Sequence, residues 1–115
     1  MKLDVFQKAY WLSIEVHRRS QGFPKFEVFE LGKQLRRAAT SVCANIVEGL
    51  TRNPSPKEKC RYLDIAMGSN DETRFWLMYA VDLGYLEPRE YEGLEKRYEE
   101  VGKMLYGVKR SIQKT

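Results

Sequence analysis

The sequence predicts an all-α protein, folded as an up-down-up-down antiparallel four-helix bundle. Apolar residues recur at steps of three and four along most of the chain, which is the spacing of one helical face. Proline and glycine interrupt this pattern at short connections, and no segment alternates as a strand does. A chain of 115 residues suits one domain. We therefore expect a single four-helix-bundle domain over residues 1–115, with helices at about 3–20, 28–48, 56–84 and 88–113.

The first helix is expected over residues 3–20. Its predicted buried line consists of Leu3, Phe6, Tyr10, Ile14 and His17, with Ala9, Ser13 and Val16 beside it. Pro24 ends this helical region, because proline lacks a backbone donor and disfavours helical geometry at Phe23. We expect His17 to be a hydrogen-bonded or partly exposed side chain, and neither a base nor a metal ligand.

The second helix, over residues 28–48, carries an apolar stripe and a basic face. The stripe consists of Leu31, Leu35, Ala38, Val42, Ile46 and Gly49. Lys33 and Arg37 fall on the opposite face, and Arg36 lies on the flank, about 100° from Leu35. Gly49 is expected just past the last turn, where a left-handed backbone costs glycine nothing.

The third helix begins at the clearest boundary in the sequence. Ser55 and Glu58 are spaced to cap each other's free backbone amides, with Pro56 at the first helical position. Further along, the segment 75–81 is apolar nearly all round, and such a segment is usually buried on every side. A 115-residue monomer has little chain with which to cover it. We therefore predict a homo-oligomer whose subunit interface includes Phe75, Trp76, Met78 and Tyr79.

The fourth helix, over residues 88–113, follows Pro88. Its apolar residues alternate steps of three and four and fit a heptad seam: Tyr91, Leu94, Tyr98, Val101, Leu105, Val108 and Ile112. Short connections between the four helices make sequential helices antiparallel neighbours.

The chain is mildly basic, with a net charge of +4, and its positive excess lies at the two ends of the sequence. One group of cations should gather where the first helix ends and the second begins, facing only Glu27 and Glu30. The group consists of Arg18, Arg19, Lys25, Lys33, Arg36 and Arg37. Such a patch suits the phosphate backbone of RNA or DNA. On charge alone, an ordinary solubilising surface is an equally good interpretation.

The sequence lacks the usual signatures of catalysis. It contains no GxSxG, HExxH or phosphate-binding glycine loop, so we expect no enzymatic activity, no catalytic residue and no cofactor. Cys43 and Cys60 lack metal-ligand spacing and are expected to be free thiols, with no metal. No apolar run approaches the roughly 20 residues that cross a bilayer, and no secretory signal is present. We expect a cytoplasmic protein without membrane contact.

A set of short motifs, spread in order over nearly the whole chain, carries a family resemblance. The motifs are Phe23-Pro24, Gln34-Leu-Arg-Arg-Ala-Ala39, Ser41-Val42, Ala44-Asn-Ile46, Glu48-Gly49, Ile65-Ala66, Gly68-Ser69, Glu72 and Leu83-Gly-Tyr-Leu86. In these the chain resembles the four-helix-bundle family of 23S rRNA intervening-sequence proteins, also called S23 proteins. It departs from the family pattern at Cys43, where relatives usually have proline, and at Arg74, where relatives usually have a second acidic residue after Glu72.

The resemblance implies partners as well as a fold. Relatives are encoded within rRNA intervening sequences, and similar bundles, the accessory variability determinants of diversity-generating retroelements, form barrel-like pentamers that partner a reverse transcriptase. The implied assembly is a ring-like homo-oligomer, with five subunits if it follows those proteins. Asn45, Glu48 and Glu72 lie where the resemblance is strongest. We expect them to form a half-buried hydrogen-bond network that fixes helix register, with Arg36 or Arg74 as the partner.

Two functional hypotheses follow. The first is a non-enzymatic homo-oligomeric bundle that binds RNA or an RNA–DNA intermediate through phosphate contacts. The alternative is a protein-interaction scaffold with no nucleic-acid binding of its own, whose partner docks on the apolar half of the third helix or on the basic rim.

Overall fold

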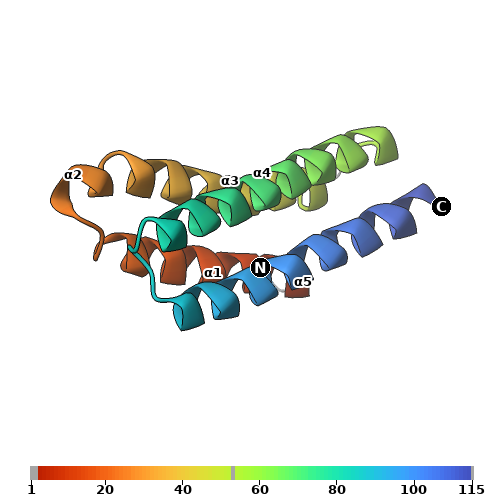
Figure 1. Cartoon of the computed structure of the whole chain (residues 1–115). Helices are drawn as coiled ribbons and strands as arrows, with labels where there is room; N and C mark the ends of the chain where they lie inside the picture. Colours follow the sequence, from red (N-terminus) through yellow and green to blue (C-terminus); the bar gives the residue numbers. More distant parts are fainter. Residues whose placement is uncertain (1–2, 53, 115) are drawn as a thin grey trace.

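The computed structural model describes residues 3–52 and 54–114, and within them every regular element is a helix. The elements are α1 (Asp4–Ser20), α2 (Lys25–Val28), α3 (Leu31–Leu50), α4 (Pro56–Asp82) and α5 (Pro88–Gln113). Four long helices lie antiparallel in a bundle, and the single turn α2 lies across the connection between α1 and α3 (Figure 1). Each long helix packs against two others, in the cyclic order α1, α3, α4, α5. The predicted fold class is confirmed.

The helix bounds differ from the expected ones around the second helix. We expected one helix from residue 28, but α2 ends at Val28 and α3 begins at Leu31. Between them the backbone of Glu30 leaves helical geometry, with φ −110° and ψ −90°. The chain therefore turns sharply before it enters α3. At the same end of the bundle, α4 stops at Asp82, and Gly84 adopts the left-handed conformation with φ 82° (Figure 1).

Gly49 has a different role from the expected one. It lies inside α3, which continues to Leu50, and it is not a helix cap. A Cβ atom on Gly49 would lie 2.9 Å from the Cβ atom of Tyr62. The glycine therefore allows α3 and α4 to approach closely at this point.

The core confirms the apolar stripe of α3 and corrects that of α1. All six stripe residues of α3 are buried. In α1 the buried apolar residues are Val5, Ala9, Leu12 and Val16, whereas Leu3, Tyr10 and His17 are exposed. Apolar side chains occur on two adjoining faces of α1, so the helical period alone does not select one. Packing against α3 and α5 turns the Val5–Val16 side inward.

The predicted cap of α4 is half present. The Ser55 hydroxyl accepts a hydrogen bond from the Glu58 backbone amide at 3.2 Å. The Glu58 carboxylate pairs with Arg61 at 3.0 Å instead of returning to the cap. The reciprocal arrangement occurs at the start of α5, where Glu87 and Glu90 form a capping box.

Two buried side chains of the core have unpaired polar atoms. The Asn70 side-chain amide donates to the backbone carbonyl oxygen of Tyr98 at 2.9 Å. The side-chain oxygen of Asn70 and the Tyr98 hydroxyl have no hydrogen-bond partner among the described residues. Burial raises the pKa of the Tyr98 hydroxyl. Burial also raises the pKa of the Cys43 thiol, although a hydrogen bond with Ser13 opposes the shift. Both groups are therefore protonated at neutral pH.

Candidate functional site

The predicted cationic cluster is brought to one end of the bundle, where α1 ends, α2 turns and α3 begins (Figure 1). Arg36 is half-buried and the other members are exposed. The first turn of α5 reaches the same end and adds Glu87, Arg89 and Glu90, which the sequence argument did not count. Arg19 pairs there with Glu90. Acidic residues from a distant part of the chain thus reduce the positive charge of this end.

Arg36 has a structural role. Its guanidinium donates to the Ser20 hydroxyl at 2.8 Å and to the Val28 carbonyl oxygen at 2.9 Å. Ser20 is fully buried, so Arg36 joins the end of α1 to the end of α2. Gly32 leaves the necessary room, because a Cβ atom there would lie 2.9 Å from a guanidinium nitrogen of Arg36. These donors face the protein, and Arg36 is a poor candidate for a phosphate contact.

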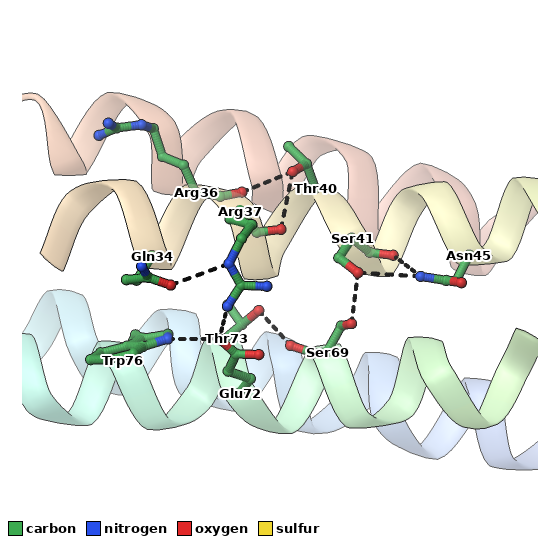
Figure 2. A network of polar contacts seen from close by, with 10 residues as sticks. All are labelled: Gln34, Arg36, Arg37, Thr40, Ser41, Asn45, Ser69, Glu72, Thr73 and Trp76. Carbon is green, nitrogen blue, oxygen red and sulfur yellow. Dashed lines mark hydrogen bonds and ion pairs between the residues drawn. The ribbon is translucent and has the colours of Figure 1, made fainter. Parts of the chain in front are cut away.

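Arg37 belongs to a polar cluster between α3 and α4. Its guanidinium pairs with Glu72, and the same carboxylate accepts the Trp76 indole N–H at 3.0 Å (Figure 2). Gln34 accepts a further hydrogen bond from Arg37 at 3.2 Å. Our expectation that Arg36 or Arg74 would be the partner of Glu72 was wrong. Arg36 points away from Arg37 in Figure 2, and Arg74 pairs with Glu95 of α5 at 2.5 Å.

Asn45 and Glu48 do not join this cluster. Asn45 donates to the Ser41 carbonyl oxygen at 2.8 Å, and the Ser41 hydroxyl contacts the Ser69 hydroxyl at 2.8 Å across the α3–α4 seam (Figure 2). Glu48 pairs with Arg52, which follows the end of α3 by two residues, at 2.8 Å. The expected single network is therefore two separate inter-helix contacts and one local ion pair.

Three members of the predicted cluster keep their charges free. Arg18, Lys25 and Lys33 are exposed and have no side-chain partner in the part of the chain that the structure describes. They come from α1, α2 and α3 in turn. We call these three residues the basic edge. It is half the size of the patch expected from sequence, because Arg19, Arg36 and Arg37 are bound within the chain.

The predicted oligomer interface forms an exposed apolar surface on α4. Phe75 and Met78 are each 45% exposed, and Tyr79 and Leu83 are each 47% exposed. Trp76 is half-buried, with its ring 4.9 Å from Phe75 and 6.0 Å from Tyr79 between centroids. The chain itself therefore leaves this segment partly uncovered. We call these four exposed residues and Trp76 the α4 aromatic face.

The α4 aromatic face borders the turn that carries α2. A groove of about 340 Å³ is lined by Phe75, Trp76 and Tyr79 from α4 and by Glu27 and neighbouring residues from the α2–α3 region. Exposed phenylalanines lie in that region as well, Phe26 at 70% and Phe29 at 75%. Exposed apolar side chains of this size often mark a site of protein association.

A second groove, which the sequence argument missed, lies between α1 and α5. It has a volume of about 460 Å³ and is lined by Trp11 and Arg18 from α1 and by Arg97 and Glu100 from α5, with other α1 residues. Trp11 is 60% exposed. In the sequence, the signal for this groove is Trp11, a large aromatic residue on the polar side of an amphipathic helix. The predicted buried line of this helix includes Tyr10 but assigns no role to Trp11.

The polar residues form no recognisable metal site: no group of three metal-ligating side chains occurs within residues 3–52 and 54–114. Cys43 and Cys60 are free thiols, as expected. No helix in the described ranges is both long and apolar enough to cross a membrane.

Comparison with known proteins agrees with this geometry. The family model described as 23S rRNA-intervening sequence protein matches residues 1–107. The chain belongs to this family. No curated protein matches it. Among solved structures, a protein of unknown function from the S23 ribosomal protein family of Bacteroides thetaiotaomicron is similar, with a TM-score of 0.85 and 24% identity over 92% of this chain and 95% of that one. The family and fold expected from the sequence motifs are thus confirmed.

Proposed function

We propose that this family member is a non-enzymatic, homo-oligomeric helical bundle that binds nucleic acid, either RNA or an RNA–DNA intermediate, through phosphate contacts. Self-assembly is carried by one observation: Phe75, Met78 and Tyr79 remain nearly half exposed on α4 after the chain has folded. Burying these side chains against another copy of the chain stabilises the assembly by roughly 25 cal/mol for each Å² of apolar surface removed from water. The proposal places the protein in the cytoplasm. It takes the number of subunits, five, from the pentamer that the resemblance implies.

Nucleic-acid binding is supported by the basic edge and by the family. Arg18, Lys25 and Lys33 present positive charge with no side-chain partner among the described residues, and assembly multiplies this edge around a ring. The family description itself refers to sequences that interrupt 23S rRNA. The resemblance noted from the sequence extends to similar bundles of diversity-generating retroelements, whose partner is a reverse transcriptase, and we extend that partner to this chain as part of the proposal.

The assembly half of the proposal is tested by light scattering of the purified protein at micromolar concentration. We expect a mass of several subunits for the wild type and a monomer for the double variant Met78→Glu with Tyr79→Glu, because the carboxylates cannot be buried without large cost. Tyr106→Glu is the matched control, since Tyr106 is 54% exposed on α5. A monomeric wild type contradicts self-assembly.

The nucleic-acid half is tested with a salt titration of RNA binding. Each phosphate contact contributes about 0.7–0.9 to the slope of log K against log salt, so neutralising Arg18, Lys25 and Lys33 with glutamine is expected to lower that slope by about 2. A control with the same loss of charge replaces Lys57, Lys96 and Lys114, all exposed and without a side-chain partner in the described part. Equal effects of the two triple variants contradict the assignment to the basic edge.

The scaffold alternative is favoured by the same exposed face on α4, because a different protein can also cover it. It predicts that the wild type binds no nucleic acid at moderate salt while the α4 double variant loses a protein partner, such as a reverse transcriptase.

A further inference from the structure

The α1–α5 groove combines an exposed aromatic ring with unpaired positive charge. Trp11 is the most exposed large hydrophobic side chain on α1, at 60%. The edge-on neighbour Tyr10, with ring centroids 5.1 Å apart and an interplanar angle of 81°, limits the positions of the indole. Arg18 lines the same groove and has no side-chain partner within the described residues.

We propose that this groove is a stacking site for single-stranded nucleic acid, in which a base lies on the Trp11 indole and a neighbouring phosphate is held by Arg18. The inference rests on the proposed function and names its substrate class. It assigns to Trp11 a role that the phosphate contacts of the basic edge do not require.

The spacing of the two groups suits one strand. Trp11 and Arg18 are seven residues apart on the same side of α1, which corresponds to about 10 Å along the helix axis. An extended strand that places a base on the indole therefore passes the guanidinium with an adjoining phosphate. Arginine holds phosphate through several N–H donors in a planar fork.

The walls of the groove are held in place by ion pairs across the α1–α5 seam. Lys8 pairs with Glu100 at 2.7 Å, and Glu15 pairs with Arg97 at 2.5 Å. Arg97 also donates from Nε to the Gly93 carbonyl oxygen at 3.3 Å. These contacts fix Arg97 beside the groove and balance its charge with that of Glu15, so Arg18 is the lining cation that keeps no side-chain partner among the described residues.

The chemistry of the lining favours a single strand over the other possible occupants. In a duplex the bases are stacked on one another, so only an unpaired base can lie on an aromatic side chain. A second copy of the chain suits the groove poorly, because its rim carries charged residues from both helices. Apolar partners have a better surface in the α4 aromatic face.

The test uses the full chain and two labelled probes, an oligouridine of about 15 nucleotides and a duplex RNA of the same length. Trp11→Ala is expected to weaken oligouridine binding roughly 5- to 150-fold, the effect of one lost base stack, and to leave duplex binding unchanged. Tyr106→Ala, at an exposed aromatic of α5 outside the groove, is the control and is expected to change neither affinity. Trp11→Phe is expected to restore part of the lost affinity.

A second readout follows Trp11 directly. In a Trp76→Phe background the remaining indole is Trp11, and oligouridine is expected to quench its fluorescence. If the wild type binds both probes, Trp11→Ala binds them equally well, and oligouridine does not quench the fluorescence of the Trp76→Phe variant, the stacking site is wrong and the proposed function stands. If the wild type binds neither probe, the proposed function and the site both fail. A change in oligomer mass with Trp11→Ala also overturns the inference, because the groove then holds another subunit.

Discussion

The close approach of α3 and α4 at Gly49 gives a prediction with a matched control. Replacing glycine by alanine inside a helix stabilises the helix by about 1 kcal/mol, because alanine has the higher helix propensity. At Gly68, which lies inside α4, an added Cβ meets no atom within 4 Å. Gly68→Ala should therefore raise the free energy of unfolding by about 1 kcal/mol.

At Gly49 the same gain is opposed by a collision. The added Cβ lies 2.9 Å from the Cβ of Tyr62, and overpacking of this kind costs about 1–3 kcal/mol. The propensity gain is common to both substitutions, so their difference measures the collision alone. We expect Gly49→Ala to be less stable than Gly68→Ala by about 1–3 kcal/mol.

Urea unfolding followed by circular dichroism measures both variants. All samples need equal protein concentration, because assembly changes apparent stability. Gly107→Ala is a second control, since a Cβ there also meets no atom within 4 Å. If Gly49→Ala is as stable as Gly68→Ala, the α3–α4 approach is looser than the structure describes and the argument for Gly49 fails.

Three further predictions concern single groups. Tyr98→Phe removes a buried hydroxyl without a partner among the described residues and should raise the free energy of unfolding by about 1 kcal/mol, whereas Tyr106→Phe should not. Because burial raises the pKa of Tyr98, the folded protein keeps this hydroxyl protonated above pH 10, where the unfolded tyrosine ionises. The free energy of unfolding should therefore be constant with respect to this group below pH 10 and should fall as the pH rises further. Tyr98→Phe should flatten this pH dependence in urea titrations. Ser55→Ala removes the α4 cap and should cost about 1 kcal/mol in the same assay. In a Cys60→Ser variant, iodoacetamide should label Cys43 more slowly in the folded than in the urea-unfolded protein, because burial raises the pKa of that thiol; equal rates count against it.

The candidate site could be predicted from sequence only in part. Four of the five residues of the α4 aromatic face, all but Leu83, were found because apolar side chains on every side of one helix cannot all face one core. The basic patch was overestimated, because partners of Arg19 and Arg37 come from α5 and α4 and are 71 and 35 residues away in sequence. No local sequence pattern predicts ion pairs between residues so far apart in the chain.

What the sequence determined by itself was the number of long helices, the stripe of α3, the seam of α5 and the family. These depend on local spacing and on proline or glycine at the connections, which act within a few residues. The tertiary structure decided which side of α1 is buried, why Gly49 is a glycine, and which cations remain free. The reason is physical: burial, close approach and ion pairing depend on which helices become neighbours, and that is settled only when the whole bundle packs.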